Sequence, residues 1–416
     1  MKLRNLLLSL AAVCIAQASF ANGFQVLLQG TKQTGRGNVG VGYGPDASSL
    51  FFNPGALSFL ESTQIQVGFS PVMSNISYRG LEGSQKYQST SPMGTPFHAY
   101  GVYRPSAESP WAFGLGIFTP FGSTVTYDHD WTGRYSLQEI SLQSIYIQPT
   151  VSYRIGEKVS VGAGLDIVTG SVVFQKSNTA PGGDINSKIE GNTLQYAFNV
   201  GVFAQLNEKL SLGVNYRSGV DMKVEGGDAT FNVPNAYIAG VLGMAEGVNT
   251  DKFNATLPLP QTIAIGVGYK VTDKLALALD FNYVGWSVYE ALEVEFEEFS
   301  ANNISFDRNW QDSYIINFGA EYNALDDLVV RAGIYYDTTP VRDGYMTPES
   351  PDANTIGLTV GASYNIGDHF SIDAAFLYNT KEQRENVIPD GVNTGALNGV
   401  YKASAMIPSI AVNYKF

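Results

Sequence analysis

Alternation of apolar and polar side chains recurs from Thr63 to the C-terminus and constrains the fold of this chain more than any other feature. The last strand is the clearest case, because one face carries large apolar side chains and the other small or polar ones: Met406, Pro408, Ile410, Val412, Tyr414 and Phe416 against Ala405, Ser409, Ala411, Asn413 and Lys415. Residues 261–271 and 274–283 repeat the pattern. A period of two predicts β-strands whose two faces meet different surroundings.

The connections between these strands alternate between short and long. The short ones are 104–110, 155–158, 207–209, 271–273, 323–327 and 366–369, and the long ones are 80–94, 119–138, 175–191, 226–255, 290–309, 338–353 and 380–403. This order predicts an all-β fold, a transmembrane antiparallel β-barrel over residues 61–416 with tight turns at one rim and long loops at the other. Fourteen strands fit between the connections, and an even number lets the last strand pair with the first.

Tyrosines end the apolar faces of several strands, at positions 153, 216, 269, 322, 364 and 414. An aromatic ring with a polar tip suits the boundary between lipid and water, so these residues are interpreted as an interfacial girdle. The soluble alternative is a β-sandwich with its apolar faces turned inward, but sandwich strands are shorter and have no reason to end repeatedly in tyrosine.

Residues 1–21 have the features of a secretory signal. Lys2 and Arg4 precede an apolar segment at 6–16, and Ser19-Phe20-Ala21 forms a small-x-small cleavage site. The mature chain is therefore expected to begin at Asn22 and to be exported to the outer membrane of a Gram-negative cell. The one cysteine, Cys14, lies within the signal, so no thiol chemistry is expected in the mature chain.

The charge of the chain argues against a nucleic-acid partner. The formal balance is −13, and removal of the signal leaves 23 basic against 38 acidic residues, a balance of −15. Phosphate binding needs a basic surface. Beyond the signal, no apolar stretch approaches the 18 residues or so of a membrane-spanning helix.

Residues 22–60 fit neither a strand nor a long amphipathic helix. The segment is rich in glycine and mostly polar, so it cannot bury enough apolar surface to fold alone. A barrel of fourteen strands has a lumen too wide for its own side chains to fill, and predicted inward positions such as Asp166, Asn215 and Asp280 are polar. We therefore predict that residues 22–60 form a plug, or hatch, inside the lumen.

A set of short motifs resembles the FadL-type (OmpP1/FadL/TodX) outer-membrane transporters of long-chain fatty acids and other hydrophobic compounds. In chain order these are Asn22-Gly23-Phe24-Gln25, the Asn53-Pro54 element, Trp131-Thr132-Gly133-Arg134-Tyr135, Leu257-Pro258-Leu259-Pro260 before Gly268-Tyr269, and Asn413-Tyr414-Lys415-Phe416. The resemblance covers essentially the whole mature chain, and the combination is more specific than any single motif.

The resemblance implies a fourteen-stranded barrel closed by an N-terminal hatch and a passive route through a side opening into the bilayer. The family's hatch motif is Asn-Pro-Ala beside a kinked strand, whereas this chain has Asn53, Pro54 and Gly55. It also implies a non-enzymatic protein without a cofactor. The expected partners are hydrophobic small molecules or fatty acids, together with outer-membrane lipid and lipopolysaccharide. A closed barrel needs no partner chain, so a monomer is expected.

The loop at 226–255 carries a candidate landing site for hydrophobic cargo. After Pro234, with Asn235 as the N-cap, a helix would place Ile238, Val241, Leu242 and Ala245 on one face. An exposed apolar helix either binds something or caps the mouth of the barrel, and the sequence leaves both options open.

The segment 113–121 is the candidate for a kink or lateral opening, because Gly114 and Gly116 weaken a strand and Pro120 cannot donate a ladder hydrogen bond. The alternative is a strand with small inward residues that make room for the hatch. The candidate pocket aromatics are Phe118, Phe121, Trp131 and Trp286, each of which has a girdle position as its alternative.

Arg134 and Arg331 are the candidate partners of a cargo carboxylate, although Arg331 has a lumen or hatch acid as its alternative partner. No catalytic constellation is apparent. The histidines, His98, His129 and His369, are too scattered to share a metal, so no metal site is expected; acidic loops suit a solvated surface better than calcium. The competing functions are an outer-membrane lipid-modifying enzyme, which would need a nucleophile and base at one rim, and a general porin or adhesin.

Overall fold

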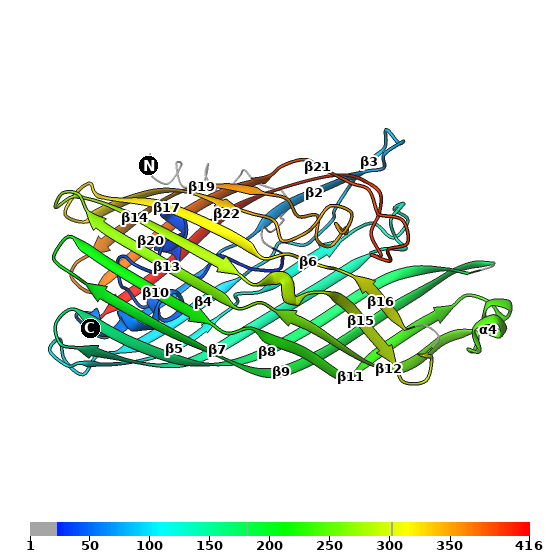
Figure 1. Ribbon diagram of the computed structural model, residues 1–416, viewed down its shortest axis with the longest axis horizontal. Coiled ribbons are helices and arrows are strands. Elements are labelled where there is room, and N and C mark those ends of the chain that lie inside the picture. Colours follow the sequence, from blue (N-terminus) through cyan, green and yellow to red (C-terminus); the bar gives the residue numbers. More distant parts are fainter. Residues whose placement is uncertain (1–22, 181, 301–302) are drawn as a thin grey trace, which may run out of the picture.

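The computed structural model describes residues 23–180, 182–300 and 303–416, so the predicted signal at 1–21 and the predicted mature start at Asn22 lie outside the described residues. The described chain forms one antiparallel barrel, seen from the side in Figure 1. Its first and last strands pair along Gln64–Phe69 and Lys415–Ile410, which closes the cylinder. The predicted closed barrel of fourteen antiparallel strands is confirmed.

Seven of the fourteen barrel strands are interrupted and consist of two segments each. In chain order the segments are β1 (Gln64–Phe69) with β2 (Met73–Arg79), β3 (Lys86–Gln88) with β4 (Phe97–Tyr103), β5 (Trp111–Phe118) with β6 (Gly122–Thr126), β10 (Leu210–Arg217) with β11 (Val220–Val233), β12 (Gly247–Leu259) with β13 (Thr262–Lys270), β14 (Leu275–Val284) with β15 (Ala291–Phe296), and β16 (Ile304–Asp307) with β17 (Ser313–Asn323). The thirteenth strand, β20 (Phe370–Lys381), has a short extension, β21 (Arg384–Asn386).

The remaining barrel strands are continuous: β7 (Glu139–Ile155), β8 (Val159–Ala180), β9 (Gly183–Gln205), β18 (Leu328–Asp337), β19 (Thr355–Ile366) and β22 (Gly399–Lys415). The long connection predicted at 175–191 is wrong, because β8 continues to Ala180 and β9 begins at Gly183. At 22 and 23 residues, these strands exceed the 9–11 or so that cross a bilayer. Beyond the membrane both faces of a hairpin can be polar, so the sequence there loses the alternation that marks a lipid-facing strand.

The outer surface of the barrel carries the predicted apolar faces. Ile410, Val412 and Tyr414 of β22 are exposed, as are Ile263 and Ile265 of β13. Of the predicted girdle, five tyrosines are exposed, at 153, 269, 322, 364 and 414. The predicted inward residues Asp166, Asn215 and Asp280 are buried, and so is Asp373. The apolar face of each strand is therefore on the outside of the barrel, and the polar face lines the lumen.

The N-terminal segment lies inside the barrel as a hatch and contains three short helices, α2 (Thr31–Gly35), α3 (Ser49–Phe52) and η1 (Pro54–Phe59). It is the dark-blue chain in the left half of Figure 1, and most of its residues are buried. The other helices lie in connections: α4 (Ala236–Leu242), at the far end of the extended hairpins, and η2 (Trp286–Val288).

Among the inward glycines of the barrel wall that touch the hatch, we term seven the glycine belt; Gly114, Gly116 and Gly268 also touch it, at Leu50 or Tyr43, and are not counted in the belt. At each of the seven, an added Cβ atom would lie less than 3 Å from a hatch atom. The seven come from β8, β9, β10, β13, β17, β18 and β19 and are Gly162, Gly201, Gly213, Gly266, Gly319, Gly333 and Gly361. Because glycine has no side chain, the wall approaches the hatch backbone directly.

Candidate functional site

The Asn53-Pro54-Gly55 element fixes the hatch to the barrel wall. The Asn53 Nδ2 donates to the carbonyls of Val41, at 2.9 Å, and Val202 of β9, at 3.0 Å. The Gly55 carbonyl accepts from the hydroxyls of Ser152, at 2.9 Å, and Ser160, at 2.6 Å. A Cβ at Gly55 would lie 2.9 Å from the Gly201 carbonyl oxygen, so glycine at this position lets η1 approach β9 closely.

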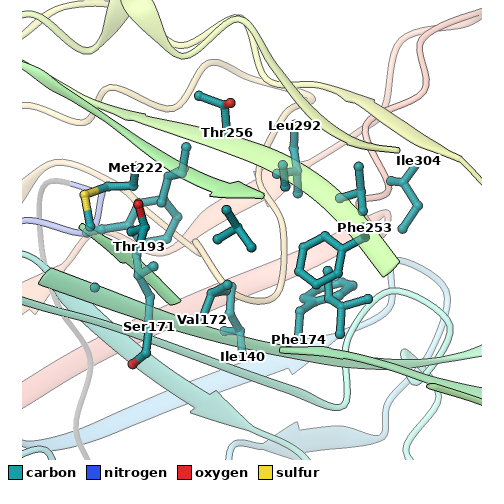
Figure 2. A pocket seen from close by; sticks show the side chains of 18 of the residues that line it. Ile140, Ser171, Val172, Phe174, Thr193, Met222, Phe253, Thr256, Leu292 and Ile304 are labelled. Carbon is teal, nitrogen blue, oxygen red and sulfur yellow. The ribbon is translucent and has the colours of Figure 1, made fainter. Parts of the chain in front are cut away.

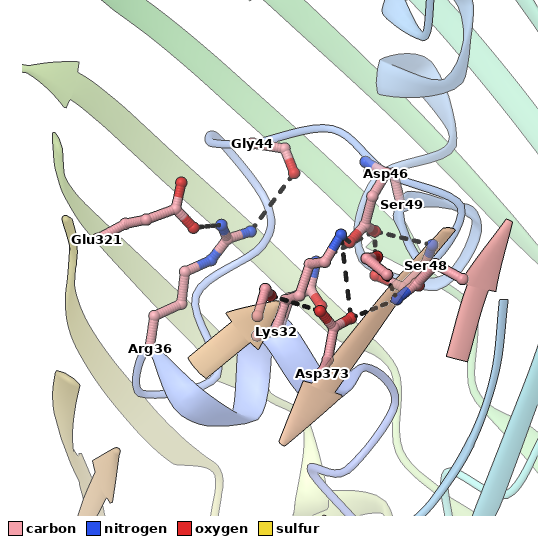
Figure 3. Close-up of polar contacts among 12 residues, drawn as sticks. Lys32, Arg36, Gly44, Asp46, Ser48, Ser49, Glu321 and Asp373 are labelled. Atoms are coloured by element: carbon pink, nitrogen blue, oxygen red, sulfur yellow. Dashed lines mark hydrogen bonds and ion pairs between the residues drawn. The ribbon is translucent and has the colours of Figure 1, made fainter. Parts of the chain in front are cut away.

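Charged groups hold the opposite side of the hatch, as Figure 3 shows. Arg36 pairs with Glu321 of β17 at 3.2 Å, and Lys32 lies 3.9 Å from Asp373 of β20. Asp280 of β14 accepts from the backbone nitrogens of Gly40 and Val41, at 2.7 and 2.9 Å. Buried ion pairs and hydrogen-bonded carboxylates are costly to separate, because each partner would be left charged and without solvent.

Beyond the hatch, an apolar cavity of about 90 Å³ opens among β7, β8, β9, β11, β12, β15 and β16 (Figure 2). Among the described residues, Glu349 is the one charged residue that lines it. Other lining side chains are Ile140, Leu142, Val172, Phe174, Met222, Val224, Phe253, Leu257, Leu292 and Ile304. None of the predicted pocket residues lines this cavity. Its signal was present in the sequence as apolar residues on the inward face of the extended strands, above the polar lumen.

The first residues of the hatch reach this cavity. Phe24 lines it and packs against three aromatic rings, with centroid distances of 6.2 Å to Trp286, 5.6 Å to Trp310 and 6.4 Å to Tyr289. Trp286, a predicted pocket residue, is fully buried behind Phe24. Phe24 is thus anchored by aromatic packing beside the apolar cavity.

Strand pairing in the barrel wall is interrupted just beyond the predicted glycines. Gly114 and Gly116 pair with both neighbours, β4 and β7, so the prediction of an opening there is wrong; they face Leu50 of the hatch and make room for it. The break lies at residues 119–121, where the register against β7 shifts between Phe118↔Tyr146 and Gly122↔Gln143. Pro120 lies at the break, and proline cannot donate to a ladder. An opening for cargo at Pro120 stays a prediction.

Beside the break is an opening of about 230 Å³ between residues 92–97 and 119–124, and Val26 of the hatch lines it. In the part of the chain that the structure describes, β6 has ladder pairing with β7 alone. Hydrogen bonds bound the opening at both ends. Thr119 Oγ1 accepts from Phe97 N and donates to the Phe97 carbonyl, both at 3.3 Å. Thr90 N donates to the Thr126 carbonyl at 2.7 Å, and Thr126 N donates to Ser91 Oγ at 3.1 Å. We term this feature the wall opening.

The hatch pairs with the broken strand. Val26 N donates to the Pro120 carbonyl at 2.8 Å, and Gly122 N donates to the Phe24 carbonyl at 2.9 Å. Between them, Gln25 and Phe121 form an isolated antiparallel bridge. Because Phe24 lines the apolar cavity and Val26 lines the wall opening, this segment lies between the two, together with Leu142, which lines both.

The remaining predicted aromatics lie apart from the apolar cavity. Phe118 is fully buried against Phe51, with ring centroids 5.2 Å apart. Trp131 stacks on Tyr127 at 4.0 Å, and its indole donates to the Leu137 carbonyl at 2.6 Å. Phe121 is buried and lines the wall opening.

Helix α4 begins as predicted, because the Asn235 side chain accepts from Ile238 N at 3.0 Å. Its face is split: Ile238 is buried, Leu242 is half-buried, and Val241 is 58% exposed. The helix ends at Leu242, so the predicted fourth member of the face, Ala245, lies beyond it. Helix α4 therefore covers the neighbouring strands with Ile238 and at the same time exposes apolar surface at Val241.

Both candidate arginines already have acidic partners. Arg331 bonds Glu321 at 2.6 Å within the barrel, the alternative that the sequence left open, and Arg134 bonds Asp184 at 3.0 Å in the loops. Hydrogen bonding to Asp184 raises the pKa of Arg134. Neither arginine lines the apolar cavity, and binding of a cargo carboxylate by either one stays a prediction.

Two further features bear on the class of protein. Within residues 23–180, 182–300 and 303–416, no group of three or more histidine, cysteine or acidic side chains could hold a metal ion. None of the helices in these ranges is long and apolar enough to cross a membrane.

A closed barrel with an apolar exterior, an internal hatch and an apolar cavity defines an outer-membrane transporter of hydrophobic compounds. The chain belongs to the family described as outer membrane protein transport protein (OMPP1/FadL/TodX), whose model matches residues 12–416. The family is made up of transporters rather than enzymes.

Several relatives match nearly end to end. The 47 kDa outer membrane protein of Pasteurella multocida is 28% identical over 433 residues, covering 100% of this chain and 99% of the relative. The long-chain fatty acid transport protein of Escherichia coli O6:H1 is 21% identical over 443 residues, with 98% of each chain covered. Among solved structures, a Pseudomonas aeruginosa FadL homologue has a TM-score of 0.83 at 19% identity, covering 95% of this chain and 100% of its own. The Pseudomonas putida toluene transporter TodX has a TM-score of 0.74 at 16% identity, covering 96% and 100%.

Proposed function

We propose that this chain takes up long-chain fatty acids by passive diffusion and releases them sideways through the wall opening. The observation that carries the proposal is the position of Phe24, Gln25 and Val26. This segment lines the apolar cavity at one end and the wall opening at the other, and backbone hydrogen bonds attach it to the broken strand. Displacement of three residues would join the two spaces.

The axial route is the less favourable one. The glycine belt brings the wall against the hatch backbone, and buried pairs such as Arg36–Glu321 hold the hatch in place. A hydrophobic solute moving axially would have to disrupt these contacts and then enter water. A solute moving sideways enters lipid, where its apolar surface stays out of water.

Cargo is expected to reach the cavity by way of the extended hairpins. Helix α4 presents Tyr237 and Val241 to the outside, at 65% and 58% exposure. The cavity behind lies among the same extended strands and has an almost entirely apolar lining. The exposed surface of α4, the apolar cavity and the wall opening thus form a series of sites for a hydrophobic solute.

Two observations bear on the identity of the cargo, and each favours a different candidate. The fatty acid transport protein of E. coli, which matches this chain almost end to end, favours long-chain fatty acids. The absence of any basic residue from the described lining of the apolar cavity favours an uncharged hydrocarbon as a second candidate. Solved structures of toluene transporters share the fold.

Uptake of radiolabelled hexadecanoic acid by cells that lack their own transporter tests the proposal. A Ser123→Trp variant fills the wall opening, because Ser123 is buried and lines it, and uptake should fall to near background. The matched control is Ser305→Trp on an exposed position of β16. Heat-modifiable gel mobility shows whether each barrel is folded. A folded Ser123→Trp protein with normal uptake would contradict lateral release, and turnover of labelled phospholipid by the purified protein would favour the enzyme alternative.

A further inference from the structure

A smaller cavity of about 60 Å³, with both apolar and polar lining residues, lies between the hatch and strands β10, β13, β14 and β17. One side of it is apolar and includes Leu27, Val41, Phe51, Pro120 and Phe121. The other side carries amide, hydroxyl and guanidinium groups, from Gln25, Asn38, Asn215, Arg217, Thr262, Asn282 and Asn317. We term it the amide chamber.

Asn38 is the most unusual residue of this chamber. Its backbone has φ of 64°, a left-handed conformation that few residues other than glycine adopt, although asparagine tolerates it. The residue is only 6% exposed, and among the described residues neither its Nδ2 nor its Oδ1 has a hydrogen-bond partner. Buried amides without partners are costly, so this side chain is positioned for a group that the protein itself does not supply.

Asn215 adds a second free acceptor, because its Oδ1 is buried and has no partner within the described chain. The neighbouring amides are already used: Asn282 donates to Asn317 at 2.9 Å, and Asn317 donates to the Gly37 carbonyl at 2.7 Å. The hydrogen-bonding groups without a partner in the chamber are thus the Asn38 amide, which can donate and accept, and the Asn215 Oδ1, which can accept.

The charge in the chamber is compensated. Arg217 forms an ion pair with Asp166 and also donates to the Phe51 carbonyl at 3.2 Å. No excess positive charge therefore awaits an anion. The free groups instead match an uncharged head that both donates and accepts, such as a hydroxyl or a protonated carboxylic acid.

The chamber adjoins the route of release. Pro120 and Phe121 line it, and Phe121 also lines the wall opening. At roughly 10–15 Å³ for each water-sized group, 60 Å³ has room for about four such groups, which suits a head group but not a chain. A head in the chamber would leave its chain near the wall opening.

We infer that the amide chamber binds the uncharged polar head of an amphiphilic cargo through Asn38 and Asn215 while its chain passes toward the wall opening. A hydroxyl would donate to Asn215 Oδ1 or Asn38 Oδ1 and accept from Asn38 Nδ2. The inference rests on the proposed lateral route and adds to it a preference for amphiphiles over plain hydrocarbons at the exit.

The test compares uptake of radiolabelled decan-1-ol and decane, which share a chain length and differ in the head. The variant is Asn38→Gly with Asn215→Leu, because glycine keeps the left-handed backbone without an amide and leucine replaces an amide of similar size. The control is Asn379→Leu on β20, another buried asparagine with an unpartnered Oδ1, which does not line the chamber.

The double variant should lower the initial rate for decan-1-ol about ten-fold, the effect of two lost hydrogen bonds, and leave the rate for decane within about two-fold. Asn379→Leu should change neither the rate for decan-1-ol nor the rate for decane. Equal losses for both probes, or no loss for either, would overturn the amide chamber as a head-group site and leave the proposed transport intact. If the unmodified protein moved neither probe nor hexadecanoic acid, the proposed function itself would fail.

Discussion

Single polar side chains decide how the hatch and the barrel meet. Asn53 is fully buried and contacts three backbone groups at once, two carbonyls through Nδ2 and the Gly55 nitrogen through Oδ1. One of these carbonyls belongs to the barrel strand β9 and another to the hatch. The amide therefore joins two elements whose backbones would otherwise leave these groups unpaired.

Replacement Asn53→Ala should loosen the hatch without unfolding the barrel. The change removes all three hydrogen bonds, so local opening of residues 40–60 should become at least about ten-fold more frequent. Hydrogen–deuterium exchange of hatch peptides measures this directly. Asn323→Ala, at an exposed site of β17, serves as the control, and equal exchange in both variants would show that Asn53 does not anchor the hatch.

At the scale of elements, the glycine belt explains how strands can lie flat against an irregular segment. Hatch backbone at Val41 and Gly42 lies where side chains of Gly213 and Gly266 would otherwise be. These glycines weaken β10 and β13 as isolated strands, but neighbouring strands pair along their whole length.

A side chain in the belt should therefore displace the hatch. Gly213→Val would place a branched side chain against the Val41 carbonyl and should cost about 1–3 kcal/mol, the usual range for overpacking. Gly101→Val on β4 is the matched control, because a Cβ there meets nothing within 4 Å. Thermal unfolding followed by heat-modifiable mobility should show a lower midpoint for Gly213→Val alone, and identical midpoints would contradict the belt as a packing surface.

The strands and the hatch could be predicted from the sequence, whereas the residues that line the cavity and the wall opening could not be identified from it. Alternation in β13 and β22 follows directly from lipid on one face, and the glycine content of residues 22–60 excludes independent folding. The apolar cavity depends on inward residues such as Phe174 and Phe253 that meet only after the hairpins pair. Gly114 and Gly116 misled the prediction, because a glycine that admits Leu50 has the same sequence signal as one that breaks a ladder.

At the scale of the whole molecule, the barrel is divided into two halves with different interiors. The half shown at the left of Figure 1 is filled by the hatch and its polar contacts, and the extended hairpins at the right surround the apolar cavity. The wall opening lies beside Val26, where the hatch begins. This arrangement obstructs the axis of the barrel and supports the proposed release of cargo sideways into lipid.

Ion conductance in planar bilayers tests this central claim most directly. The intact protein should show no steady current, because the hatch and its close contacts with the glycine belt obstruct the lumen. A variant that lacks residues 23–60 should show a large and stable current through the same barrel. A large steady current from the intact protein would instead indicate an aqueous porin and contradict lateral release of hydrophobic cargo.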